Sequence, residues 1–230
     1  MGKRIIQQAR GHGSLTYRVR RQAYKYKIGY PIVEGKGKIL ELINSPAHSA
    51  PLAKIIIGDK VFFSPAFDGA MVGQEIETGK SGNGNILQLK DIAQGINVYN
   101  IEAKSNDGGK LVRASGLSAI VTKKVPGRVA VMMPSKKEVW FNEKCRATIG
   151  TVAGQGRLEK PIIKAGKKWH MMKAKNRLWP RTSAVKMNAV DHPFGSGRGK
   201  RIKSKIAKRN APPGARVGHI RPSRTGRRKR

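Results

Sequence analysis

The sequence predicts a mainly β protein in which small barrels of short strands are flanked by long basic extensions. Short β-rich segments recur along the middle of the chain with glycine and proline turns between them, and no long helical periodicity is present. Lysine and arginine are concentrated toward both ends. The 230 residues, of which 38% are hydrophobic, are enough for one or two small domains with hydrophobic cores.

The net charge of +35 is unevenly distributed along the chain. Counted by segment, it is +8 over residues 1–37, +3 over 38–143, +10 over 144–194 and +14 over 195–230. Such an excess of positive charge indicates a polyanionic partner, most commonly nucleic acid. Residues 195–230 contain no acid and few large apolar side chains, so we expect them to be disordered until a polyanion neutralises them. The nearly neutral middle is expected to fold without the arms.

Several strands are predicted in the first half. Lys54–Ile57 and Lys60–Phe63 flank Gly58-Asp59, which predicts a tight hairpin. Residues 38–43 form another β-rich segment and end at a turn signal. The alternating residues 15–20 predict a further strand with arginines on its solvent or RNA face.

A second group of strands is predicted after the loop Gly79–Gly84, which we interpret as a domain boundary. A single helical turn is considered at Asp91–Gln94, and from Gly154 onward the chain is predicted to be an extended, basic, glycine-rich arm. The predicted strands are Ile96–Ala103, Leu117–Lys123, Arg128–Met133, Glu138–Phe141 and Ala147–Val152. Short strands at this spacing indicate small barrels.

Three other functional classes find little support. The Gly-Lys-Ser of residues 79–84 is not a phosphate-binding loop, because the earlier glycine that this motif needs is replaced by Gln74 and no helix is predicted to follow. Cys145 is the only cysteine and stands at no recognisable zinc spacing, so it is expected to be a buried small hydrophobe, with a catalytic thiol as the less favoured alternative. No apolar run approaches the ~20 residues of a membrane-spanning helix, and no signal peptide is recognised.

Asp191-His192 is the one candidate for catalysis. A carboxylate beside an imidazole can orient a general base, but adjacent residues rarely pair side chain to side chain in the manner of a triad, and no nucleophile motif is present. Glycines at 195, 197 and 199 allow the backbone to approach a phosphate or base closely. The favoured alternative is that His192 contacts a nucleotide while Asp191 caps a turn.

Several stretches together resemble one known family. They are RGHGSLTYRVR (10–20), SPAHSAPLAKI (45–55), GGKLVRASG (108–116), CRATIGTVAGQGR (145–157), PIIKAGKKWH (161–170) and WPRTSAVKMNAVDHPFGSGRGK (179–200). The chain resembles the second protein of the large ribosomal subunit, in its archaeal form, over essentially its whole length. The family carries Asn-x-Val-Asp/Glu-His-Pro-x-Gly-Gly-Gly, from which this chain departs at Ala189, where proline is more common, and at Ser196, where glycine is common.

The resemblance implies an OB-like barrel followed by an SH3-like barrel. From this resemblance we expect four parts: a basic N-terminal arm over 1–37, the OB-like barrel over 38–84, the SH3-like barrel over 85–159 and an RNA-binding arm over 160–230. The implied role is structural, in rRNA binding, subunit association, tRNA binding and the architecture of the peptidyl transferase region, with RNA as the catalyst. Implied partners are large-subunit rRNA, neighbouring ribosomal proteins and the small subunit, with one copy per cytoplasmic ribosome and no membrane.

The candidate RNA-binding residues are mainly arginines, whose planar fork engages phosphate bidentately, together with lysines, histidines, glycines and one tryptophan. They are Arg10, His12, Arg18, Arg20, Arg113, Arg146, Arg157, Lys167, Lys168, Trp179, Arg181, His192, Gly195, Gly197, Arg198, Lys200, Arg201, Arg227 and Arg228. Trp169, Trp179 and Phe194 are either base-stacking partners or small-core anchors. No cofactor or metal is expected, apart from Mg²⁺ associated with rRNA.

Two alternatives remain open from the residues alone. A DNA-compacting protein would share the charge, and it would prefer duplex DNA over structured RNA. An RNA-processing hydrolase would use Asp191 and His192 and would show turnover on RNA or ester substrates.

Overall fold

The computed structural model describes residues 2–196, 206–207 and 209–220, and the chain is mainly β, as predicted. It divides into two compact units. Residues Arg20–Lys167, here called the barrel unit, contain both large sheets. The described residues of Met1–Val19 and Lys168–Arg230 form the second unit, here called the terminal unit.

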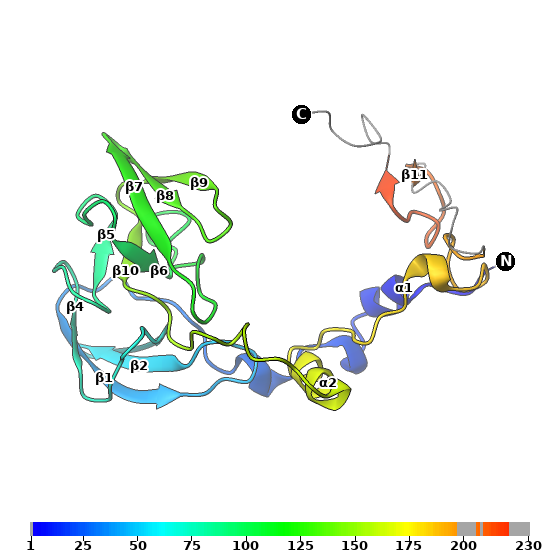
Figure 1. Ribbon diagram of the computed structural model, residues 1–230, viewed down its shortest axis with the longest axis horizontal. Helices are drawn as coiled ribbons and strands as arrows, with labels where there is room; N and C mark the ends of the chain where they lie inside the picture. The colour runs from blue at the N-terminus through cyan, green and yellow to red at the C-terminus, as the bar shows by residue number, and fades with distance from the viewer. Residues whose placement is uncertain (1, 197–205, 208, 221–230) are drawn as a thin grey trace. The chain divides into compact units, whose positions relative to one another are not determined.

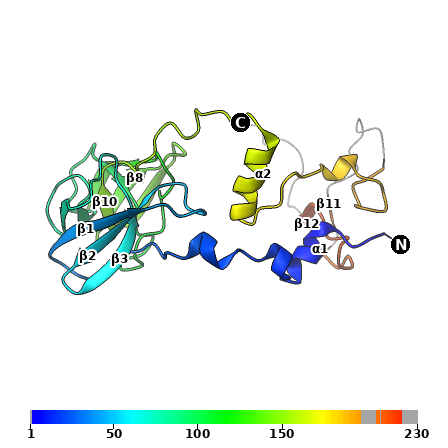
Figure 2. The same cartoon turned by 90° about the horizontal axis from the view of Figure 1, so that it is seen from below.

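The first sheet of the barrel unit has four antiparallel strands in the order β3-β2-β1-β4. Their bounds are Lys36–Ile43 (β1), Leu52–Ile57 (β2), Lys60–Pro65 (β3) and Glu75–Glu77 (β4). Figure 2 shows β1, β2 and β3 side by side. Ile57 pairs with Lys60, which confirms the predicted hairpin, and Gly58 at its tip takes a φ of 55° that favours glycine.

The second sheet has six strands in the order β5-β10-β6-β7-β8-β9, and β7, β8 and β9 are green in Figure 1. The bounds are Ile86–Gln88 (β5), Asn97–Tyr99 (β6), Ala119–Val125 (β7), Arg128–Met132 (β8), Glu138–Asn142 (β9) and Arg146–Ile149 (β10). Each predicted strand after the 79–84 loop has a counterpart, although β6 keeps only part of its predicted length. The short strands β4 and β5 were not predicted, and turns rather than a helix follow β5.

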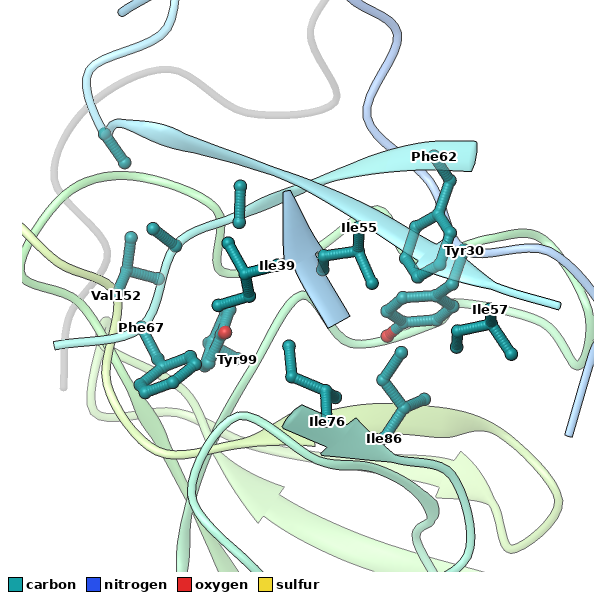
Figure 3. Close-up of a cluster of buried hydrophobic side chains, with 13 residues drawn as sticks. Tyr30, Ile39, Ile55, Ile57, Phe62, Phe67, Ile76, Ile86, Tyr99 and Val152 are labelled. Carbon is teal, nitrogen blue, oxygen red and sulfur yellow. The ribbon is translucent and has the colours of Figure 1, made fainter. Parts of the chain in front are cut away.

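The hydrophobic core joins the two sheets. Ile39 and Ile55 from the first sheet share one buried cluster with Ile86 from the second, and with Tyr99 and Val152. Figure 3 shows these side chains directed toward one another from both sides of the cluster. A second cluster fills the six-stranded sheet and includes Cys145, which is fully buried between β9 and β10. This confirms the interpretation of the cysteine as a small hydrophobe, and burial raises the pKa of its thiol.

Two sequence predictions about the ends of the chain are wrong. Residues 15–20 are not a strand, and no strand within the described part of the chain pairs with them. They hold the 3₁₀ turn Leu15–Tyr17, in which Tyr17 N donates to Ser14 O at 2.9 Å, and a second 3₁₀ turn follows at Arg21–Tyr24. The arm after Gly154 is not extended throughout, because Ala165–Ala174 forms helix α2.

Helix α2 shows no helical periodicity in sequence because it buries no residue. It depends instead on the helix propensity of its alanine, lysine and methionine residues. The other short elements of the described residues are α1 (Ile6–Gly11), a 3₁₀ turn at Ala184–Lys186, and β11 (Ile206–Ala207) paired in parallel with β12 (His219–Ile220). Of residues 195–230, for which disorder without a polyanion was predicted, 197–205, 208 and 221–230 lie outside the described residues.

Candidate nucleic-acid interface

Among the candidate RNA-binding arginines that the structure describes, Arg146 is the most constrained. Its Nη2 and Nε atoms donate to Glu102 Oε1 at 2.7 Å and 3.1 Å, and its Nη1 atom donates to the carbonyl oxygen of Pro31 at 2.7 Å. The guanidinium carbon also lies 5.2 Å from the centre of the Tyr30 ring. With these groups engaged, Arg146 joins segments of the barrel unit rather than presenting an open fork to phosphate.

Glu102 is fully buried and gathers donors from around it. Besides Arg146, its carboxylate accepts hydrogen bonds from the backbone N–H groups of Asn106 and Gly108, both at 3.1 Å, and from that of Arg146 at 2.8 Å. A buried carboxylate needs this number of donors to offset its lost hydration. Glu102 carries no signal of this role in the sequence, and only the strand pairing that brings β10 beside β6 reveals it.

Arg113 and Arg157 also contact the protein itself. Arg113 Nε donates to Asn100 Oδ1 at 2.9 Å, and burial lowers the pKa of its guanidinium. Arg157 Nε donates to the buried hydroxyl of Ser115. In both residues the guanidinium group donates to another part of the barrel unit, so both side chains help to order its loops.

Other candidates are exposed. In the barrel unit, Arg20 precedes the second 3₁₀ turn and Lys167 lies on α2, both open to solvent. In the terminal unit, Arg10 lies in the last turn of α1, His12 follows the helix, and Arg18 Nε donates to Gly13 O at 2.7 Å. These exposed basic residues suit contacts with a phosphate backbone.

Two tryptophans of the terminal unit each lie beside a lysine. Lys168 Nζ is 5.3 Å from the centre of the Trp179 ring, and Lys173 Nζ is 4.3 Å from that of Trp169. Trp169 is 39% exposed and Trp179 is partly buried, so Trp169 is the more open to a base. Aromatic faces interleaved with cations favour single-stranded or looped RNA.

The segment around Asp191-His192 forms a compact turn. The backbone N–H groups of Asp191 and His192 both donate to Asn188 O, at 3.0 Å and 3.2 Å. Gly195 N donates to His192 O at 2.8 Å, and Ser196 N to Met187 O at 3.1 Å. The turn is therefore ordered by its own backbone.

The geometry separates the two side chains that were considered for catalysis. The carboxylate of Asp191 lies 3.6 Å from Lys3 Nζ, and the backbone N–H of Lys3 donates to Val190 O at 2.8 Å. The Nδ1 atom of His192 accepts a hydrogen bond from the backbone N–H of Phe194 at 3.0 Å. An accepting Nδ1 places the proton on Nε2 in the neutral ring, so His192 can donate to a ligand from that atom.

Gly195 and Ser196 give the turn its shape. A Cβ on the buried Gly195 would lie 2.7 Å from Met187 O and would also overlap Asn188, so this glycine is needed for packing within the chain. Gly195 therefore has a role in packing that the sequence did not indicate, and its approach to RNA stays a prediction. Ser196 takes a φ of 70°, a conformation that favours the glycine common at its position in the resembled family.

His192 also lines an open cavity of about 450 Å³ within the terminal unit. Its other walls combine apolar side chains from both ends of the chain with two arginines: Ile5, Ile6, Leu178, Pro180, Met187 and Val217, with Arg181 and Arg216. Sequence reasoning found Arg181 and His192 but missed Ile5 and Arg216, since no local pattern shows that residues 5 and 216 meet.

Comparisons with known proteins agree with these features. The family described as Ribosomal Proteins L2, C-terminal domain, matches residues 82–214. "Large ribosomal subunit protein uL2" of Methanococcoides burtonii is 45% identical over 99% of this chain and 100% of its own length. The proteins of the same description from Methanospirillum hungatei and Archaeoglobus fulgidus are 46% and 44% identical, over 99% and 98% of this chain and 100% and 99% of their own lengths. The chain belongs to the uL2 family.

Membership of the uL2 family fits the fold. Its barrels are OB-like and SH3-like, in that order, which matches the four-stranded sheet followed by the six-stranded sheet. Six candidate RNA-binding residues lie outside the described residues, namely Gly197, Arg198, Lys200, Arg201, Arg227 and Arg228. Over the residues that are described, no group of three or more His, Cys, Asp and Glu side chains could hold a metal. In the same residues, no helix is long and apolar enough to cross a membrane.

Proposed function

We propose that this uL2 protein is a structural constituent of the large ribosomal subunit that binds large-subunit rRNA. Its proposed location is the cytoplasmic ribosome, in one copy, beside other ribosomal proteins. It supports association with the small subunit, binding of tRNA and the architecture of the peptidyl transferase region. Family membership supports the ribosomal assignment.

The observation that supports RNA binding is the difference in net charge between the two units. Each unit contains 24 lysines and arginines, but the barrel unit balances them with 12 acids and the terminal unit with one. A surface of this kind binds the phosphate backbone through release of counterions, and each phosphate contacted adds to the salt dependence. The barrels supply the rigid part, and the terminal unit supplies most of the net positive charge.

The exposed candidates divide by chemistry. Arg20, Lys167 and Arg181 supply cations for phosphate, and Trp169 supplies an aromatic face for a base. Arg113, Arg146 and Arg157 act mainly by holding the barrel unit in shape. The two sheets support the organisation into an OB-like barrel over 38–84 and an SH3-like barrel over 85–159, joined near the 79–84 loop.

His192 is proposed to be an RNA contact rather than a catalytic base. Its Nδ1 is occupied by the backbone of Phe194, and Asp191 pairs with Lys3 instead of orienting the ring. A general base needs an orienting partner and a nucleophile within reach. The Nε2–H group remains as a donor to a base or phosphate, and the RNA performs the chemistry.

Crosslinking of the full chain in cell lysate tests this function. The expected result is that large-subunit rRNA is the main crosslinked nucleic acid. Recovery of duplex DNA in its place would favour a DNA-compacting protein. Turnover of RNA or ester substrates by the purified chain, lost in His192→Gln, would favour the hydrolase.

A further inference from the structure

The outer face of β7, β8 and β9 in the SH3-like barrel combines an exposed aromatic ring with basic side chains. Val129 and Val131 of β8 point into the core, whereas Ala130 between them belongs to the opposite face. Ala130 pairs with Lys123 of β7 on one side and with Trp140 of β9 on the other. The three residues therefore form one row across the outer face.

Trp140 is placed to present a ring to solvent. It is 46% exposed on β9, which ends the six-stranded sheet, yet Ala130 beside it is completely buried. Since directly paired residues lie on the same face with their Cβ atoms about 5 Å apart, Trp140 and Lys123 flank the buried Ala130 on that face. Almost half of the Trp140 side chain remains open to solvent.

Neighbouring rows add apolar surface and charge. Val125, Arg128 and Asn142 form the next row in one direction, and Ile120, Met132 and Glu138 form it in the other. Val125 is 52% exposed and Met132 38% exposed. Lys136 and Lys137 are exposed in the turn that joins β8 to β9.

The net positive charge of residues 38–143 comes from the segment 119–142, which forms this face. Residues 119–142 contain five lysines and arginines and a single acid, Glu138, whereas residues 38–118 contain eight of each. Glu138 lies 3.9 Å from Lys123 and accepts a hydrogen bond from Thr122 at 2.8 Å, which leaves Arg128 and the turn lysines as the open cations. An aromatic ring on a basic sheet face favours an unpaired nucleotide over duplex RNA, since every base has a face that can stack.

We propose that this face is a second RNA-binding site, separate from the basic terminal unit, at which an unpaired base of rRNA stacks on Trp140 while Arg128 and the turn lysines contact the flanking phosphates. The inference rests on the proposed function, because it assumes that rRNA is the ligand. It adds a ligand geometry and a set of residues in the SH3-like barrel that the candidate RNA-binding residues do not include.

Fluorescence of Trp140 provides a direct test. The chain has three tryptophans, so the full-length double variant Trp169→Phe/Trp179→Phe reports on Trp140 alone. Titration with transcribed large-subunit rRNA is expected to quench its emission as the complex forms. Binding with unchanged Trp140 emission would overturn the inference and leave the proposed function standing. Failure of the wild-type chain to bind rRNA would overturn both.

Affinity measurements separate stacking from charge. Trp140→Ala is expected to weaken rRNA binding about 5- to 100-fold, the range for one stacked base, with no change in salt slope. Trp140→Phe should regain most of the affinity. Arg128→Ala should lower the salt slope by about one phosphate contact. The matched control is Val61→Ala on β3, an exposed apolar residue at the edge of the four-stranded sheet, which should change neither quantity.

A protein ligand would give a different result. If a neighbouring ribosomal protein quenched Trp140 and rRNA alone did not, the face would be a protein-binding surface and the inference would be wrong. Equal affinity of Trp140→Ala and the wild-type chain for rRNA would have the same meaning. Thermal unfolding of each variant shows whether it is folded before binding is compared.

Discussion

Glu102 and Arg146 form an enclosed ion pair with two hydrogen bonds, in which the carboxylate is 0% exposed and the guanidinium side chain 14% exposed. Arg146 begins β10 and Glu102 follows β6, while the same guanidinium also reaches the carbonyl of Pro31. One charged pair therefore joins the SH3-like barrel to the segment that leads into the OB-like barrel.

Removing the charge of Glu102 should strongly destabilise the barrel unit. Glu102→Gln leaves the guanidinium of Arg146 without a counter-ion, and breaking a buried pair in this way costs about 3–5 kcal/mol. Urea unfolding of the full chain measures the loss. The control is Glu77→Gln, whose partners Lys36 and Lys80 are exposed, and which should leave the free energy of unfolding nearly unchanged. Equal losses in the two variants would contradict the structural role of the buried pair.

The fold should lose stability in alkaline solution. Burial raises the pKa of the Tyr30 phenol, with a further contribution from the charge of Glu102, and burial also raises the pKa of Tyr99. In the unfolded chain both phenols ionise near pH 10, whereas in the folded chain they stay protonated to higher pH. Stability from these two groups is therefore complete below about pH 10 and decreases as the pH rises above it.

Unfolding free energy measured against pH, together with phenolate absorbance, checks this expectation. Tyr30→Phe should reduce the loss between neutral and alkaline pH, because one of the two phenols is gone. Ionisation of all five tyrosines at the ordinary phenol value in a chain that remains folded would show that the burial of Tyr30 and Tyr99 has no such effect.

The barrel unit should fold alone and bind rRNA with a shallower salt dependence than the full chain. A piece limited to residues 38–143 would lack both β10, which lies inside the six-stranded sheet, and Tyr30 of the shared core. Residues 20–167 contain both. They carry 24 cations and 12 acids, so fewer phosphates should be contacted.

The logarithm of the binding constant against the logarithm of the salt concentration, for residues 20–167 and for the full chain, gives the two slopes. Circular dichroism of the shorter piece shows whether its sheets have formed. Equal slopes would mean that the terminal unit does not supply the main phosphate contacts.

Gly195→Ala should disrupt the turn that holds His192. The added methyl would lie against Asn188 and within 2.7 Å of Met187 O, so the backbone must move. Amide exchange measures the effect, with faster exchange expected at Ser196, whose N–H bonds to Met187 O. Gly11→Ala on α1 is the control, since a Cβ there meets nothing within 4 Å. Unchanged exchange at Ser196 would show that the turn tolerates the methyl group.

His192→Gln should affect assembly rather than chemistry. The side chain donates to RNA through Nε2 in our proposal, and glutamine does not reproduce the position of that donor. Any loss of peptide-bond formation in reconstituted particles should therefore parallel the loss of correctly assembled subunits. The measurement is peptidyl transfer per assembled subunit. A fully assembled variant particle with a large drop in that rate, and without a titration step that the wild type shows, would make His192 catalytic.

Most strands of the barrel unit were predictable because they carry a local signal. The hairpin around Gly58 combines two β-rich segments with a turn residue, and β7, β8 and β9 are β-rich segments separated by turns that contain glycine or proline. The three-residue strands β4 and β5 carry too few residues for any pattern, and neither was predicted. Helix α2 was not predicted for a different reason. A helix that buries no side chain needs no apolar stripe, so the sequence shows no helical periodicity there.

The candidate interface was predictable in kind but not in detail. Composition identifies arginines as phosphate ligands, yet the roles of Arg146 and Arg113 depend on Glu102 and Asn100, which only the fold brings to them. In the same way, no local signal places Lys3 beside Asp191, since nearly the whole chain lies between them. Burial and pairing between distant segments decide which cations remain open, and a residue count does not contain that information.

The position of β10 constrains the order in which the chain can fold during its synthesis. β5 leaves the translating ribosome early, but its neighbour in the sheet is β10, so it has no strand to pair with until Arg146–Ile149 have emerged. Val152, which completes the core shared by both barrels, emerges later still. The newly made OB-like barrel therefore exposes apolar side chains of the shared core, such as Ile39 and Ile55, until the SH3-like barrel is nearly complete, a state in which chains are prone to aggregate.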